Sequence, residues 1–390
     1  MSDTQKPFAI IVGAGPCGLL LALRLAKAGL KVRLLEAGHK LDDQPRATHY
    51  SPEAVEELDK AGVLPDVQAQ GFVPDGLCWR KPDGTPIATL LASLLAEKVK
   101  HEMQCLPLDK LGKIIYDHVM KEPHASILWG HKVTGVQQRD GGASVTVDAE
   151  GTTKIMEATY VVGCDGANSQ IRRTLFGDME FPGWTWKEQI ISTTTNILPL
   201  TYYPFEKYGY IDSNMIIDPE HWYMAARMSK DGLWKVTYGE IPGLTKEQYL
   251  ERQAWKFETM LPGNPKPKDW NCTAFSPYKC HQRLAKSLRV GNILLAGDSA
   301  HLCNPFGGLG LTGGILDVGG LYDCLYGIAT GRADESILDR YSDVRRQIYH
   351  DFTDPISTGN MKRLMYNSEE ALEKDPFLQL CHDFTQYYKS

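Results

Sequence analysis

The sequence predicts an α/β protein into which an antiparallel sheet is inserted. Near the N-terminus an apolar strand, a glycine-rich turn and a helix follow one another, which is typical of a parallel βαβ unit. From about residue 178 to 275 the chain is rich in Trp, Tyr, Thr and Pro and alternates in polarity, which predicts antiparallel strands. A buried strand then returns at 291–297. We therefore expect a discontinuous body over 1–177 and 276–333, an inserted sheet over 178–275 and a helical segment over 334–390.

Composition excludes several classes of protein. The chain has 390 residues, 43% apolar and 23% charged, so it is long enough for two or three domains and is not disordered. Its 42 Lys and Arg against 48 Asp and Glu give a net charge of -6, which argues against nucleic-acid binding and a basic membrane surface. Nine cysteines without a C-x-x-C pair favour reduced thiols, and we expect no metal site. No signal peptide or transmembrane stretch is visible, so the cytoplasm is the expected location.

The first motif lies between two predicted strands near the N-terminus. Gly13 permits a tight turn, Gly15 lets the backbone approach a pyrophosphate, and Gly18 lets the next helix pack against the strand. That helix presents unpaired N–H groups and the positive end of its dipole to the phosphates. Glu36, at the end of the second strand, is placed to accept hydrogen bonds from ribose hydroxyls. The pattern predicts a bound dinucleotide without separating FAD from NAD, and a fortuitous glycine turn is the alternative.

Two further motifs also follow buried strands. Asp165, in Gly-Cys-Asp-Gly, is placed for a nucleotide contact, although an ordinary strand-end turn explains it equally well. Asp298, in Gly-Asp-Ser-Ala-His, is placed to accept from a ribityl hydroxyl. Residues 305–310 then begin a helix whose first N–H groups suit the pyrimidine edge of a flavin, which gains negative charge on reduction. His301 is interpreted as a structural histidine in preference to a catalytic one.

With the three motifs in this order, the chain resembles the single-component aromatic-ring flavoprotein monooxygenases, such as para-hydroxybenzoate hydroxylase, kynurenine monooxygenase and the fungal salicylate-hydroxylase-like enzymes. The resemblance covers residues 8 to about 350. It implies a Rossmann-like FAD-binding body of the para-hydroxybenzoate-hydroxylase type, with the inserted sheet covering the substrate. The cofactor-binding residues that it and the motifs indicate are Gly13, Gly15, Gly18, Glu36, Arg46, Ala47, Asp165, Asp298, Pro305, Gly308, Gly310 and Leu311.

The resemblance also implies a function. FAD would be bound non-covalently and reduced by NADPH or NADH from a transient site. The reduced flavin would take up O2, and the resulting flavin hydroperoxide would hydroxylate or epoxidise an aromatic or conjugated small molecule, with natural-product biosynthesis as the expected setting. The expected partners are this substrate and O2, with no nucleic acid, and the protein is expected as a monomer or a homodimer.

The chain departs from the family pattern at two places. Leu108 stands where the family has an FAD-contacting arginine, so we expect either weaker FAD binding or a substitute contact from Lys110. At the third motif, Gly-Leu-Gly-Leu-Thr over 308–312 replaces Gly-Gln-Gly-x-Asn. The backbone N–H donors survive this second change, whereas two polar side-chain contacts are lost.

The substrate side rests on one alternating strand at 222–228. Alternation places Tyr223 and Arg227 on one face and Met224 and Ala226 on the other. If the first face lines the pocket, Arg227 stabilises a phenolate or carboxylate and Tyr223 orients it, which makes them the candidate catalytic residues. A solvated Arg227 and a packing role for Tyr223 form the competing interpretation.

Other functions stay open at this point. A flavin-dependent dehydrogenase or reductase of the same fold would not insert oxygen, and a non-catalytic nucleotide-binding sensor would need no substrate. A plain NAD dehydrogenase leaves the second and third motifs unexplained. Trp184-x-Trp186 resembles part of the W-x-W-x-I-P signature of flavin-dependent halogenases, but the Ile-Pro end is absent and we interpret both rings as packing or pocket wall.

Overall fold

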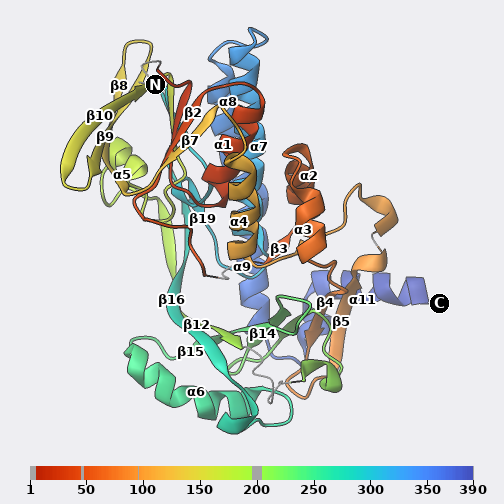
Figure 1. Ribbon diagram of the computed structural model, residues 1–390. Helices are drawn as coiled ribbons and strands as arrows, with labels where there is room; N and C mark the ends of the chain where they lie inside the picture. The colour runs from red at the N-terminus through yellow and green to blue at the C-terminus, as the bar shows by residue number, and fades with distance from the viewer. Residues whose placement is uncertain (1–5, 45–47, 95, 196–203, 390) are drawn as a thin grey trace.

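The protein is described by a computed structural model, which covers residues 6–44, 48–94, 96–195 and 204–389 (Figure 1). Two large sheets organise it. The first has six strands, all parallel except for the short strand at one edge. In spatial order they are β17 (Arg289–Val290), β18 (Ile293–Leu295), β11 (Tyr160–Gly163), β1 (Ala9–Val12), β2 (Val32–Leu35) and β7 (Ala125–Leu128).

Both faces of the six-stranded sheet are covered, which is why its central strands are apolar throughout. On one side stand α1 (Pro16–Lys27), α4 (Leu108–Val119) and α7 (Leu309–Ala329), and α1 packs against the other two (Figure 1). On the other side lie α5 (Gln170–Phe176) and a small antiparallel sheet. The strands of that small sheet are β8 (His131–Arg139), β9 (Gly142–Ala149) and β10 (Thr152–Ala158).

The second large sheet has eight strands and forms the other half of the molecule. In spatial order they are β19 (His301–Leu302), β16 (Cys272–Leu284), β12 (Gly183–Thr195), β15 (Trp234–Glu240), β14 (Tyr223–Arg227), β13 (Ser213–Ile216), β4 (Gly76–Arg80) and β5 (Pro86–Leu91). The expected boundary at residue 275 falls inside β16, and β4 and β5 come from the segment before the expected insertion. The division into domains itself stays a prediction.

The two faces of this sheet have different neighbours. Helix α6 (Lys246–Met260) lies along one face, where Phe257 and Tyr249 join the buried aromatic side chains of β14 and β15. The opposite face is turned toward the six-stranded sheet and the C-terminal helices, and Met215 and Trp222 pack there with Phe306. This difference decides which residues of each strand can reach a ligand.

The remaining elements close the molecule around the sheets. Helices α2 (Pro52–Lys60) and α3 (Leu64–Gln70) follow strand β3 (His49–Tyr50), which pairs with β6 (Gln104–Cys105). The C-terminal segment is helical, and its last helix packs on β5. Its helices are α8 (Ile337–Ile348), α9 (Asp354–Leu364), α10 (Ala371–Lys374) and α11 (Pro376–Lys389).

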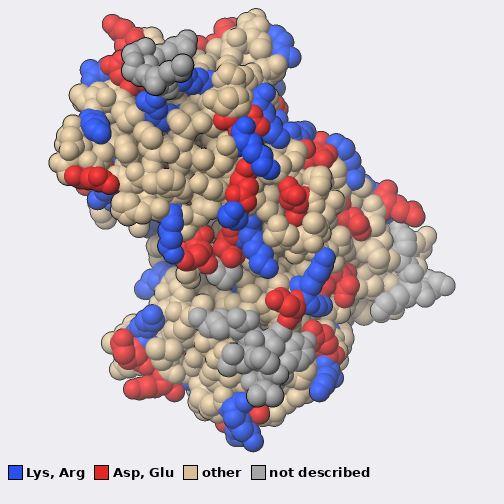
Figure 2. Space-filling view, viewed as in Figure 1, with Lys and Arg blue, Asp and Glu red and all other residues tan. Residues whose placement is uncertain are grey.

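The described part of the chain contains no helix that is both long and apolar enough to cross a membrane. Acidic and basic side chains are interspersed over the face seen in Figure 2, without an extended patch of either sign. The mixture of charges on this face agrees with the mildly acidic composition.

Candidate active site

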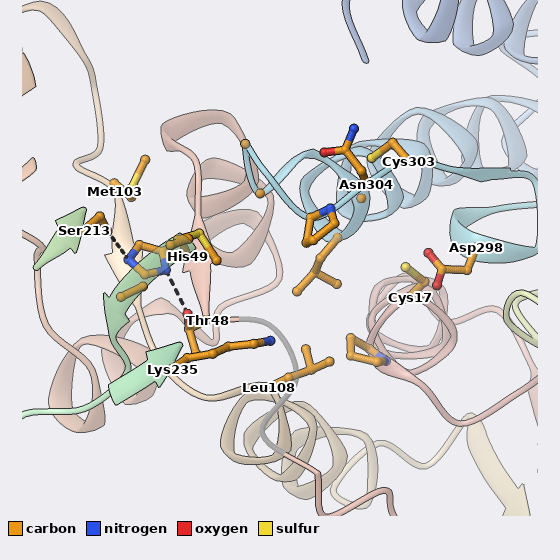
Figure 3. Close-up of a pocket in the computed structure, with 18 of the residues that line it drawn as sticks. Cys17, Thr48, His49, Met103, Leu108, Ser213, Lys235, Asp298, Cys303 and Asn304 are labelled. Atoms are coloured by element: carbon orange, nitrogen blue, oxygen red, sulfur yellow. Dashed lines mark hydrogen bonds between the residues drawn. The ribbon is translucent and has the colours of Figure 1, made fainter. Parts of the chain in front are cut away.

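A cavity of about 820 Å³ joins the two halves of the molecule. Its lining includes the glycine turn after β1, the loops after β11 and β18, the start of α7 and one face of the eight-stranded sheet. Ligands of parallel α/β sheets bind outside the carboxyl ends of the strands, and three of these loops follow such ends. Figure 3 shows Cys17 and Asp298 at one end of this cavity and His49, Ser213 and Lys235 toward the other.

The glycine turn has the shape that a pyrophosphate requires. A Cβ on Gly13, whose φ is +105°, would lie 2.5 Å from the Cys164 carbonyl oxygen, and a Cβ on Gly18 would lie 2.0 Å from the Gly13 oxygen. Neither position accepts a side chain. Gly15 differs, because it lines the cavity and a Cβ there would meet nothing within 4 Å. The open space over Gly15, at the start of α1, fits a phosphate held by backbone N–H groups.

Glu36 supports this turn directly. Its Oε2 accepts a hydrogen bond of 2.8 Å from Ala14 N, and its Oε1 accepts one of 2.7 Å from Gly38 N. Each carboxylate oxygen has a second lone pair, so a ribose hydroxyl can still be accepted beside these bonds. Glu36 does not line the cavity. Its predicted contact with the ribose would therefore lie outside the cavity, beyond the end formed by the turn at Gly15.

We expect Glu36→Ala to weaken FAD binding by about 1–3 kcal/mol, the scale of a lost hydrogen bond to a charged group. The change removes the acceptor for the ribose and loosens the glycine turn. The measurement is the dissociation constant of FAD by fluorescence titration, with the exposed Glu157→Ala as the matched control. An unchanged constant would remove the ribose role from Glu36.

The Asp165 carboxylate is engaged inside the protein. Its Oδ1 accepts from Ser169 Oγ at 2.6 Å, and its Oδ2 accepts from the backbone N–H groups of Gln170 at 2.7 Å and Ile171 at 3.1 Å. Burial raises the pKa of this carboxyl group, against the effect of those donors. Asp165 therefore caps α5, and only its neighbours Cys164, Gly166 and Ala167 line the cavity. We expect it to shape the loop, in place of the direct cofactor contact that the sequence predicts.

Arg172 ties the second motif to the third. Its guanidinium donates to the Ala167 carbonyl at 2.7 Å and to the Ser299 carbonyl at 3.0 Å, and it stacks on Phe181. Burial lowers the pKa of Arg172 to about 10, so it stays a cation at neutral pH. One side chain thus holds together two of the loops that border the cavity.

The third motif contributes several residues to this end of the cavity. Asp298 lines the cavity, as do Pro305, Gly310 and Leu311. Gly308, with a φ of +66°, is the N-cap of α7 and also faces the cavity. The first N–H groups of a helix have no partner inside it, so this terminus offers donors and positive potential to a flavin ring.

We expect Asp298→Ala to weaken FAD binding by about 10- to 100-fold, because a ribityl hydroxyl would lose a charged acceptor. The measurement is the FAD content after dialysis together with the dissociation constant. The exposed Asp351→Ala, outside the cavity wall, serves as the control and should retain FAD. A fully flavinated Asp298→Ala protein would show that the motif is assigned wrongly.

Beneath this loop lies a buried charged cluster. Asp317 of α7 accepts from Gly297 N at 2.9 Å and pairs with His301 Nε2 at 2.7 Å and with Arg345 Nε at 2.6 Å. Burial opposes the charge of His301, but the Asp317 carboxylate outweighs it and raises the pKa of the imidazole. The cluster fixes the backbone that carries Asp298. It agrees with the structural interpretation of His301.

The thiols beside the cavity fit a non-covalent cofactor. All nine cysteines are free. Burial raises the pKa of Cys17 far above its usual value and raises that of Cys303 to about 12. Both line the cavity, yet they remain protonated at neutral pH and are therefore poor nucleophiles.

The remaining residues that the sequence analysis singled out at the cofactor end are Arg46, Ala47, Leu108 and Lys110. Arg46 and Ala47 lie outside the described residues, so their predicted contacts stay predictions. Leu108, in the place of the family arginine, does line the cavity at the start of α4. Lys110, the suggested substitute, is exposed and is not part of the cavity wall.

Neither member of the candidate catalytic pair lines this cavity, so the geometry gives no support to their predicted role. Tyr223 is fully buried under α6, where its hydroxyl lies 2.6 Å from that of Tyr210. Arg227 donates to the Ser229 and Lys230 carbonyls and lies 3.5 Å from Asp212. The alternation along β14 is as predicted, but the face that lines the cavity is the one that carries Met224 and Ala226.

The residues on that face were missed. Met224 and Ala226 of β14, Ser213 of β13 and Lys235 of β15 line the cavity. His49 joins them from β3, two positions after the segment that carries Arg46. Alternation along β15 puts Lys235 and its neighbour Trp234 on different faces of the sheet. Because Lys235 pairs with Ala226, it lies on the same face as Ala226.

Comparison with known proteins places the chain in a family. A family model described as an FAD binding domain matches residues 8–355. A para-nitrophenol 4-monooxygenase from a Pseudomonas species is 35% identical over 352 residues, which cover 90% of this chain and 85% of that protein. A 6-hydroxy-3-succinoylpyridine 3-monooxygenase from Pseudomonas putida is 33% identical over 364 residues, with 93% and 90% covered.

Solved structures agree with these relatives. The crystal structure of a p-nitrophenol 4-monooxygenase from Pseudomonas putida superposes with a TM-score of 0.89, at 31% identity and with 98% of both chains covered. An aklavinone-11 hydroxylase solved with FAD and aklavinone has a TM-score of 0.79 over 94% of this chain and 70% of its own, and its 20% identity supports the fold alone. The resemblance predicted from the three motifs is confirmed. The chain belongs to the family of single-component FAD-dependent aromatic monooxygenases.

Proposed function

We propose that this monooxygenase hydroxylates the ring of a small phenol or hydroxypyridine, bound against the cavity face of β13, β14 and β15. The single observation that supports this most is the continuity of the cavity from the glycine turn to that face. A flavin at one end and a flat ring at the other would share one water-excluding space. The names of the two relatives, a nitrophenol and a hydroxypyridine monooxygenase, support the substrate class.

The protein's own groups would act mainly by holding and shielding. Bound FAD, reduced by NADPH or NADH, supplies the oxygen chemistry that no side chain can. The turn around Gly15 and the carboxylate of Asp298 would hold the pyrophosphate and ribityl parts. The start of α7 would stabilise negative charge at the edge of the ring.

The substrate end is mostly apolar. Leu77, Met215 and Met224 line it, and they would exclude water from the reacting ring. Exclusion of water strengthens each polar contact in the cavity and suppresses wasteful side reactions. Only a few polar side chains line this end of the cavity. A mostly apolar wall with a few polar groups is the usual composition of a small-molecule pocket.

The test is oxygen uptake by the FAD-loaded enzyme with NADPH or NADH and a panel of phenols and hydroxypyridines. We expect uptake that depends on 4-nitrophenol or a related ring, and a product that carries one atom of isotopically labelled O2. Consumption of the nicotinamide without labelled product from any ring of the panel would instead support the dehydrogenase alternative.

Three expectations stay predictions. The relatives above 30% identity are named for single-ring substrates, and the natural-product hydroxylases share the fold alone, so a biosynthetic setting has little added support. Nine free thiols support a reducing cytoplasm. Size-exclusion chromatography with light scattering would decide between a monomer and a homodimer.

A further inference from the structure

The first turns of helix α4 form one wall of the cavity. Leu108, Asp109 and Gly112 line it, and residues three and four positions apart lie on the same side of a helix. A Cβ on Gly112 would meet nothing within 4 Å, so this wall leaves room for a ligand to approach the helix closely. Figure 3 shows Leu108 between Lys235 and Cys17, which places the start of α4 between the substrate end and the glycine turn.

The carboxylate of Asp109 forms no hydrogen bond or ion pair with another described residue, and its Oδ1 is buried. A hydroxyl does lie in its neighbourhood, that of Tyr50. Burial, the Cys105 thiol and then the Asp109 carboxylate raise the pKa of Tyr50 well above its usual value. That hydroxyl, however, donates to the Leu106 carbonyl at 2.8 Å. The protein therefore supplies no donor to Asp109 from this side.

Two other buried carboxylates show the usual arrangement. Asp165 accepts from one hydroxyl and two backbone N–H groups, and Asp317 accepts from a backbone N–H group and contacts two cationic side chains. Leaving a buried carboxylate oxygen without a donor lowers the stability of a fold. Asp109 departs from the usual arrangement and lines the cavity, so we expect its donor to come from the ligand.

The chemistry of FAD narrows the choice of donor. The pyrophosphate has only acceptor oxygens, and its charge would repel a carboxylate. The ribose and the adenine beside it are expected at Glu36, which does not line the cavity. The N–H group of the flavin's pyrimidine edge is expected at the start of α7. The ribityl chain joins these parts, and its hydroxyl groups are the donors that a carboxylate on α4 can meet.

We propose that Asp109 accepts a hydrogen bond from a ribityl hydroxyl of FAD. It would thereby replace part of the cofactor binding that is lost with Leu108 in the place of the family arginine, a role that the exposed Lys110 does not fill. The ribityl chain would then meet one carboxylate from α4 and another, Asp298, from the loop after β18. This inference concerns the cofactor alone and does not depend on which ring the enzyme hydroxylates.

The experiment measures two properties of Asp109→Leu in the full-length protein. The first is the dissociation constant of FAD, by fluorescence titration of the apoprotein, and we expect FAD binding to weaken by about 10- to 100-fold. The second is the melting temperature of the apoprotein. It should rise by about 1–3 °C, because the variant removes a buried carboxylate that has no donor within the protein. A residue that only supports the fold would lower both the affinity and the melting temperature.

Further measurements identify the interaction and its donor. Asp109→Asn keeps an acceptor oxygen without the charge, so its FAD affinity should lie between those of the wild type and Asp109→Leu. FAD analogues that each lack one ribityl hydroxyl identify the donor. With one of them the wild type and Asp109→Leu should bind with nearly equal affinity, because the hydrogen bond is then absent from both. The matched control is the exposed Lys110→Met on the same turn of α4, which should bind FAD normally.

Four results would overturn the role of Asp109. They are an unchanged FAD affinity in Asp109→Leu, a lower melting temperature of its apoprotein, an equal loss of affinity in Lys110→Met, and the same difference between wild type and Asp109→Leu with every analogue. The last result would show that the donor is not a ribityl hydroxyl. None of them bears on the proposed function, which the oxygen-uptake assay of the wild-type enzyme decides by itself.

Discussion

Replacing Gly15 by valine is expected to abolish FAD binding while leaving the fold intact. Gly15 has φ −73° and ψ 174°, an extended conformation that valine adopts without strain, and a Cβ there meets nothing within 4 Å. The new side chain would instead fill the open space over the glycine turn, where the pyrophosphate is expected. Two charge-assisted hydrogen bonds of about 1.5–3 kcal/mol each would be lost, which weakens FAD binding by about 100-fold or more.

The measurement is the FAD affinity of the purified variant, with circular dichroism to report the fold. Gly359→Ala is the matched control, because this helix position also has no heavy atom within 4 Å and lies outside the cavity wall. It should bind FAD normally. A Gly15→Val protein that retains FAD would show that the pyrophosphate does not cross the turn.

The second large effect is expected on stability. Asp317→Asn should lower the free energy of unfolding by about 3–5 kcal/mol, because removing one partner leaves a buried charge uncompensated. Asp317 is fully buried and contacts His301, Arg345 and the Gly297 amide. Chemical denaturation with saturating FAD would measure it. Asp339→Asn, which alters the largely exposed partner of Arg289, should cost no more than about 1 kcal/mol.

The pH dependence of stability should carry the signature of the same cluster. Burial raises the pKa of Asp317, but His301 and Arg345 outweigh it and hold the pKa below its usual 3.8. Its contribution is therefore present above pH 3.8 and is lost as the pH falls through the lowered value. The pKa of His301 is raised above 6.5, so its contribution is full below pH 6.5 and is lost as the pH rises through the raised value.

Asp317→Asn should flatten the dependence of the free energy of unfolding on pH on both the acidic and the basic side. A general packing defect would lower the stability without changing this pH dependence. The variant could instead lose the same free energy of unfolding at every pH, including below pH 3.8 and above pH 6.5. The cluster would then contribute through packing and not through charge. A loss below about 1 kcal/mol would contradict the predicted cost of an uncompensated buried charge.

The shape of the glycine turn was predictable from sequence, because it depends on local backbone geometry. Gly13 lies against the Cys164 carbonyl at the end of β11, and Gly18 lies against the Gly13 carbonyl, so neither position has room for a side chain and the spacing of the two glycines is fixed. Asp165 shows the limit of this reasoning. The position of the carboxylate at the end of a strand was right, but its partners are the first N–H groups of α5, which only the folded loop reveals.

The substrate end was not predictable in the same way. Alternation in β14 divides its residues into two faces but does not say which face meets a ligand. That choice is made by α6, which covers Tyr223, and by the six-stranded sheet on the other side. His49 comes from a two-residue strand far from β13 in sequence, so its meeting with Ser213 leaves no local pattern.

The most direct measurement is a crystal structure of the protein with FAD and 4-nitrophenol. We predict FAD running from the glycine turn at Gly15 to the start of α7. We predict the phenol ring over Met224 and Ala226, on the cavity face of the eight-stranded sheet. A phenol bound on the opposite face, beside Tyr223 and Arg227, or a flavin placed away from the start of α7, would contradict the account.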